Sequence, residues 1–93
     1  MDIFEDVKRS LRVSHNYIDD EIADWIEEAR QDLVLSGVSV EKAQDDSDFL
    51  IKRAIKTYAK GQYHSDIAQA ERFKFAYDLL KTHLTMAGDY NGK

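Results

Sequence analysis

Phe49–Tyr63 reads FLIKRAIKTYAKGQY, and its residues divide into two halves on a helical wheel. The apolar half consists of Leu50, Ile51, Ala54, Ile55, Tyr58 and Ala59. The opposite half carries only positive charge, on Lys52, Arg53, Lys56 and Lys60. This pattern predicts an amphipathic helix with one side in a hydrophobic core. Its purely basic outer side is unusual because the chain as a whole is acidic, with a net charge of −5.

The flanking sequence predicts three further helices, so we expect an all-α, compact bundle of about four helices. The expected helices span residues 2–12, 17–36, 48–62 and 66–86. Asp2, followed by Glu5 three residues later, resembles a capping box for the first helix. Gly37 follows the last periodic residue of the second helix, as a left-handed C-terminal cap does. Ser65 or Asp66 is expected to cap the fourth helix.

Residues 38–47 are predicted to form a short link between the second and third helices. Val38-Ser39-Val40 is long enough only for an extended link or one edge strand, and the acidic residues after it predict a loop. The run 45–48, DDSD, lacks the alternating ligands, central glycine and closing glutamate of a calcium loop. We therefore expect Asp45, Asp46 or Ser47 to cap the third helix.

Length and composition predict a single domain over residues 1–88, followed by a flexible tail over 89–93. The chain has 93 residues, of which 43% are hydrophobic and 33% charged, as in folded globular proteins. It has no apolar run long enough to span a membrane and no signal-like start, so a cytoplasmic protein is expected.

No pattern of residues predicts catalysis, a cofactor or a metal site. The chain has no cysteine, and its three histidines, His15, His64 and His83, share no ligand spacing. Its four glycines stand apart and form no phosphate-binding loop, and no serine has a nucleophile-elbow context. We therefore expect a non-enzymatic protein.

Charge is unevenly distributed along the chain. Residues 1–48 contain 14 acidic and 5 basic residues, whereas residues 49–93 contain 4 acidic and 8 basic ones. Such segregation predicts electrostatic pairing, either inside the fold or between copies. Two solvated faces that contact nothing are the alternative, because exposed ion pairs contribute little.

The predicted fourth helix has more apolar surface than a monomer needs. One stripe suits a core, whereas a second, formed by Ala68, Phe75, Leu79 and Met86, must be covered by another element or molecule. Unlike patches that complement each other produce head-to-tail contacts, which close into rings or extend into filaments. The residues predicted to form such a subunit interface are Asp20, Asp24, Glu27, Glu28, Lys52, Arg53, Lys56, Lys60, Phe75, Leu79 and Met86.

DNA binding through the four cations of the third helix is the competing interpretation. Four positive charges on one face can contact phosphates. The acidic balance of the chain and the absence of an Asn or Gln set for reading bases argue against sequence-specific binding.

Three blocks of residues carry a resemblance to the small head–tail connector (adaptor) proteins of long-tailed bacteriophages and prophages. They are Val7-Lys8-x-x-Leu11-Arg12-Val13, then Asp19-Asp20-Glu21-Ile22 with Ile26-x-x-Ala29-Arg30, and Ile51-Lys52-x-Ala54-Ile55 with Tyr58 and Tyr63. The resemblance covers residues 3–85 and contains no catalytic motif. The chain departs from common members in lacking proline near the fourth helix and in its very short tail.

The resemblance implies a ring-forming homo-oligomer beneath the portal protein of the virion, assembled in the host cytoplasm. Such a ring extends the DNA channel, lets DNA pass without sequence-specific binding, and docks stopper or tail-completion proteins. The alternative function is a small phage-encoded regulator, such as an inhibitor whose acidic helix mimics DNA and binds a protein partner.

Overall fold

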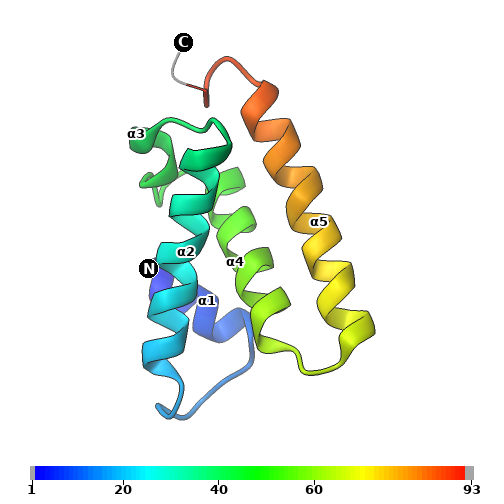
Figure 1. The fold of residues 1–93 in the computed structure, drawn as a ribbon. Coiled ribbons are helices and arrows are strands. Elements are labelled where there is room, and N and C mark those ends of the chain that lie inside the picture. Colours follow the sequence, from blue (N-terminus) through cyan, green and yellow to red (C-terminus); the bar gives the residue numbers. More distant parts are fainter. Residues whose placement is uncertain (1, 92–93) are drawn as a thin grey trace.

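The computed structural model describes residues 2–91, which contain five α-helices and no strand (Figure 1). The helices are α1 (Ile3–Ser10), α2 (Asp19–Ser36), α3 (Val40–Ala43), α4 (Phe49–Tyr63) and α5 (Ile67–Met86). The predicted all-α class is confirmed, and the ends of the four predicted helices agree within two residues. The additional helix, α3, lies in the predicted link.

Helix α4 lies in the middle of the molecule and packs against α1, α2 and α5 (Figure 1). Its predicted core side is confirmed for Ile51, Ala54, Ile55 and Ala59, which are buried, whereas Leu50 is 42% exposed. The surrounding helices contribute Ile3 and Val7 from α1, Ile22, Ile26, Ala29 and Leu33 from α2, and Tyr77 and Leu84 from α5. Burial of one such large aliphatic side chain contributes about 1.5–3 kcal/mol, so this shared core holds the four longer helices together.

Side-chain caps start four of the five helices. Asp2 accepts a hydrogen bond from the Glu5 amide at 2.9 Å, and Asp66 accepts from the amides of Ala68 and Gln69. Residues 45–47 were predicted to cap α4, and this is wrong, because Asp48 is the cap. Asp45 instead accepts hydrogen bonds from the amide and hydroxyl groups of Ser47, which fold the preceding loop.

The link between α2 and α4 is helical and anchored, which corrects the predicted extended link or edge strand. Gly37 ends α2 with the predicted positive φ, of 122°, and Val38 is buried. The hydroxyl of Ser39 then caps α3 by accepting from the Lys42 amide. Ser39 has a short polar side chain that favours helix starts, and this preference outweighs the β-propensity of the valines.

The buried side chain of Arg30, from α2, anchors this link through contacts with Ala43 and Asp46. Its guanidinium is buried and donates to the carbonyl of Ala43 at 2.8 Å, while its other terminal nitrogen lies 2.8 Å from Asp46. A buried cation is tolerated only when paired in this way. The pair therefore fixes α3 and the loop after it against α2.

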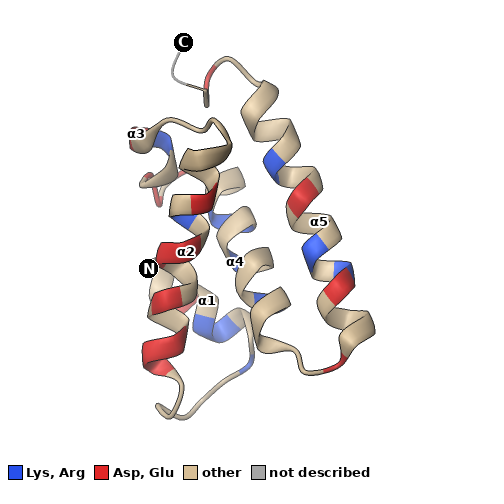
Figure 2. Ribbon diagram, viewed as in Figure 1, with Lys and Arg blue, Asp and Glu red and all other residues tan. Residues whose placement is uncertain are grey.

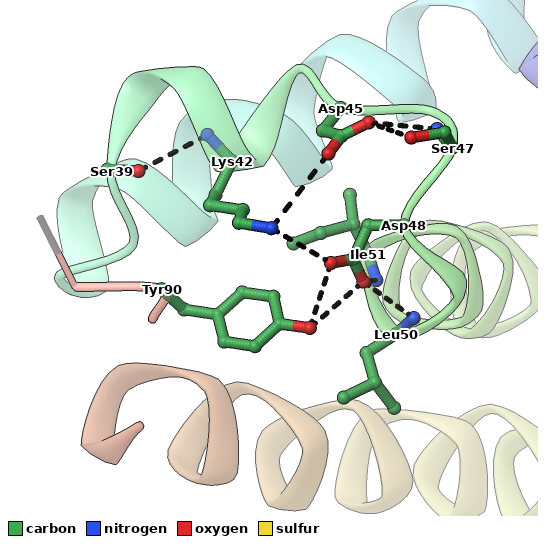
Figure 3. Close-up of polar contacts among 8 residues, drawn as sticks. All are labelled: Ser39, Lys42, Asp45, Ser47, Asp48, Leu50, Ile51 and Tyr90. Carbon is green, nitrogen blue, oxygen red and sulfur yellow. Dashed lines mark hydrogen bonds and ion pairs between the residues drawn. The ribbon is translucent and has the colours of Figure 1, made fainter. Parts of the chain in front are cut away.

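The stretch predicted to be a flexible tail includes Tyr90, which the structure places against the α3–α4 link (Figure 3). The Tyr90 hydroxyl donates to the Asp48 carboxylate, whose oxygens lie 2.8 and 3.1 Å away. The Tyr90 carbonyl accepts a hydrogen bond from the Ser39 amide at 2.7 Å. Residues 92–93 of the predicted tail lie outside the described residues.

Candidate assembly surfaces

The first candidate surface is the acidic face of α2, visible as red segments along that helix in Figure 2. Asp20, Asp24 and Glu27 are exposed and lie opposite the core side of the helix. Within residues 2–91 none of these three carboxylates has an ion-pair partner. Glu28, also exposed, accepts a hydrogen bond from the Tyr58 hydroxyl at 3.0 Å.

The basic side of α4 is less uniform than the sequence predicts. Lys52 lies 3.6 Å from Asp6 of α1, so its charge is used inside the fold. Lys60 lies over the ring of Phe73, 5.6 Å from its centroid, which is a cation–π geometry. Arg53 is exposed and Lys56 is half-exposed, and in the described part of the chain neither forms an ion pair.

The structure joins these cations to the second apolar stripe of α5. Arg53, Lys56 and Lys60 line a shallow groove between α4 and α5, which we call the basic–apolar groove. The α5 residues that line it are Phe73, Ala76, Leu79, Leu80 and His83. Leu79 is 50% exposed, and Phe75 and Met86, on the same stripe, are 66% and 78% exposed. Two of the predicted patches thus form one continuous surface.

A second groove was not predicted as a site. Val34, Leu35 and Val40 line it together with the polar residues Glu27, Arg30, Gln31 and Gln44, and we call it the α2–α3 groove. Leu35 is 86% exposed and Val40 62% exposed. The sequence did contain a signal, because Val34 and Leu35 fall off the core stripe of the helix. What it could not show is that α3 turns Val40 toward them.

Aromatic side chains are the neighbours of two of the three histidines. The rings of His15 and Tyr17 are 4.8 Å apart, and His64 stacks on Phe73 at 5.2 Å. His83 lines the basic–apolar groove. In the described part of the chain, no three histidine or carboxylate side chains gather as metal ligands, and no helix has the length and apolar character to cross a membrane.

The family described as phage connector protein matches this chain over residues 3–91. The chain belongs to that family. No curated protein and no solved structure matches it. As a phage connector it has a structural role, and the surfaces that matter are those through which it contacts other proteins. The acidic face of α2 and the basic–apolar groove between α4 and α5 are its main candidates.

The connector also contains ion pairs that join its acidic and basic halves. Besides Lys52 and Asp6, Lys81 of α5 lies 3.0 Å from Asp32 of α2, and the Tyr77 hydroxyl donates to the same carboxylate oxygen at 2.6 Å. Partial burial alone raises the pKa of Asp32, but the hydrogen bonds from Tyr77 and Lys81 outweigh it and hold the pKa below its usual 3.8. Burial and the bond to Asp32 raise the pKa of Tyr77. Part of the charge asymmetry is therefore neutralised inside the fold.

We expect Asp32 to make the connector sensitive to acid. A carboxyl group whose pKa is lower in the folded chain than in the unfolded one stabilises the fold above pH 3.8, and this contribution is lost as the pH falls through the folded-state pKa. The Asp32→Asn variant should therefore lose less stability than wild type on acidification below about pH 5. Urea unfolding across that range measures the difference. Asp24→Asn, which removes an exposed carboxylate, is the matched control; equal slopes for Asp32→Asn and wild type would contradict the expectation.

Proposed function

We propose that this connector forms a ring beneath the portal at the head–tail junction of a phage virion. The ring extends the DNA channel and docks stopper or tail-completion proteins. Subunits are made in the host cytoplasm and meet there during assembly. Membership of the phage connector family over residues 3–91 supports the general role.

The observation that carries the proposal is the uncovered apolar stripe of α5 beside the α4 cations. Phe75, Leu79 and Met86 are each at least half exposed. A contiguous exposed apolar surface rimmed by charge is typical of a protein–protein contact. Since the acidic face of α2 is unlike this surface, a contact between the two is heterologous, and such contacts close into a ring when the rotation between copies divides a full turn.

The proposed interface pairs the acids of one copy with the cations of the next. Asp20, Asp24, Glu27 and Glu28 of one copy face Arg53, Lys56 and Lys60 of its neighbour, beside the stripe of Phe75, Leu79 and Met86. Lys52 contributes less than the sequence predicts, because Asp6 of the same copy already pairs with it.

DNA passes through the proposed ring without sequence-specific contacts. The net charge of −5 gives the subunit the same sign as DNA, which discourages retention of the DNA in the channel. In addition, the cations of α4 that pair with acids of the neighbouring subunit are no longer available to bind the phosphates of the DNA.

Light scattering and negative-stain imaging over a concentration series test the proposal, with the wild-type chain alone and with the portal protein of its phage. Ring-shaped particles should grow in number with concentration and decline with salt, because added ions screen the charge pairs. A chain that stays monomeric at high concentration and low salt, and adds no ring to the portal, would contradict it.

A small regulator that mimics DNA is the second candidate function. It is favoured by the line of exposed carboxylates on α2, Asp20, Asp24 and Glu27, which have no ion-pair partner within residues 2–91. Such a protein forms a small complex of fixed stoichiometry with a DNA-binding partner. A monomer that DNA displaces from that partner would support this second function and exclude the first.

A further inference from the structure

We infer that neighbouring copies in the ring lie side by side with their helices pointing the same way, and that the α2–α3 groove of one copy receives the C-terminal end of α5 from the next. This inference rests on the proposed ring. It assigns the partner of the α2–α3 groove, which is a second copy of this chain.

The outer side of α2 changes character along its length. Asp20, Asp24 and Glu27 occupy its first half, and Gln31 and Leu35 continue the same line at spacings of three or four residues. The acidic start and the apolar end, Asp20 and Leu35, are therefore about 22 Å apart, at ~1.5 Å per residue. Val40 of α3 extends the apolar end into the α2–α3 groove.

The opposite surface changes character over a similar distance. Lys60 lies over Phe73, which fixes the basic end of this surface at the first half of α5. Met86, the last residue of α5, forms its apolar end. Phe73 and Met86 are about 20 Å apart along the helix, at ~1.5 Å per residue. Each surface thus has its charges at one end, of opposite sign on the two surfaces, and an uncharged apolar residue at the other end, over a similar length; Phe75 and Leu79 continue the apolar stripe beside the cations.

The direction of the helices decides how these surfaces can meet. Helices α2 and α5 run the same way and lie at opposite edges of the view, with α4 between them (Figure 1). Their C-terminal ends are at the same end of the molecule, where the side chain of Thr85 lies next to Gly37.

If neighbouring copies are related by a rotation axis parallel to these helices, the acids of one copy therefore face the cations of the next, and Leu35 of one faces Met86 of the next. Turning the neighbour upside down would instead place Leu35 against Lys60 and the acids of α2 against Met86. Only the first arrangement places the acids of α2 beside the cations of α4 and, at the same time, the apolar Leu35 beside the apolar Met86. Electrostatic complementarity of this kind fixes register between protein surfaces.

Cysteine cross-linking tests the arrangement cleanly because the chain contains no native cysteine. The test variant combines Leu35→Cys with Met86→Cys, both at exposed positions. Under mild oxidation, or with a short bis-maleimide, it should give a ladder of covalent oligomers on a denaturing gel. Each single variant can form dimers at most.

The control for direction combines Tyr17→Cys with Met86→Cys. Tyr17 is 89% exposed and precedes the start of α2, so it meets Met86 of another copy only if the copies are inverted or stacked end to end, and not if they lie side by side in the same direction. This variant should give no ladder. Higher salt should reduce the ladder of the Leu35→Cys/Met86→Cys variant.

The outcomes separate the inference from the proposed function. Ring particles together with a ladder from Leu35→Cys/Met86→Cys alone support both. Ring particles without that ladder, or with a ladder from Tyr17→Cys/Met86→Cys, overturn the inference and leave the ring intact. If wild type and all variants form no rings, even with the portal protein, both are overturned.

Discussion

Replacing Asp48 by alanine should destabilise the connector by about 3 kcal/mol, a large fraction of the 5–15 kcal/mol that holds a domain of this kind folded. Loss of an aspartate N-cap alone costs about 1 kcal/mol. Asp48 caps α4 through the amides of Leu50 and Ile51, at 2.9 and 3.2 Å. The rest of the loss comes from contacts that other caps in this chain do not make.

Those further contacts connect three segments at one carboxylate (Figure 3). The Tyr90 hydroxyl donates to Asp48 from the C-terminal segment, and Lys42 of α3 lies 3.3 Å from it. The Asp48 side chain is only 12% exposed. When it is replaced by alanine, water therefore poorly replaces the carboxylate as the partner of the Tyr90 hydroxyl and of Lys42. Burial raises the pKa of Asp48, but the bonds from Tyr90, Ile51, Lys42 and Leu50 hold it below its usual range.

Asp66→Ala is the matched control for Asp48→Ala. Asp66 caps α5 through two amides in the same way and is exposed, so its loss measures the cap alone. Urea unfolding of both variants should show a loss of about 1 kcal/mol for Asp66→Ala. Tyr90→Phe, alone and combined with Asp48→Ala, isolates the tyrosine contact in a double-mutant cycle. If the two alanine variants lose equal stability, the contacts to Lys42 and Tyr90 contribute nothing.

The contrast between Asp48 and Asp2 shows which parts of the fold are predictable from sequence. Asp2 caps α1 through Glu5, three residues away, and its capping role was predicted. The partner of Asp48 from the C-terminal segment is 42 residues away in the chain, and only the packed structure brings it close. Helices α2, α4 and α5 were predictable because their apolar periodicity extends over several turns. Helix α3 has a single turn, too short for periodicity to show.

The candidate surfaces also include features that local sequence predicts and features that depend on how the helices pack. The exposure of Phe75, Leu79 and Met86 follows from a second stripe on α5, which the sequence shows directly. Lys52 was grouped with Arg53 and Lys56 because all three share one side of α4. Its pairing with Asp6 depends on where α1 crosses that helix, and no local pattern contains this information. The α2–α3 groove was missed for the same reason, because Leu35 and Val40 lie on different helices.

Lys56→Glu should abolish assembly of the connector at concentrations where the wild type forms rings. Lys56 lies in the middle of the three cations that line the basic–apolar groove. In the proposed interface its reversal turns attraction to the α2 acids into repulsion, which costs about 2 kcal/mol, or about 30-fold in affinity, at each contact. Every subunit contact in the ring carries the substitution, so the loss of free energy is repeated at each contact and the ring as a whole is destabilised by their sum. Sedimentation velocity and negative-stain imaging measure the outcome.

The control and the rescue identify the partner of Lys56. Lys74→Glu changes the net charge equally but lies on another side of α5, in the cleft lined by Asp32, and should leave assembly intact. Adding Glu27→Lys to Lys56→Glu restores opposite charges across the interface and should recover rings. If Lys74→Glu dissociates the ring as strongly, net charge alone governs assembly. If Lys56→Glu dissociates it and Glu27→Lys does not restore it, the cations of α4 meet a surface other than α2.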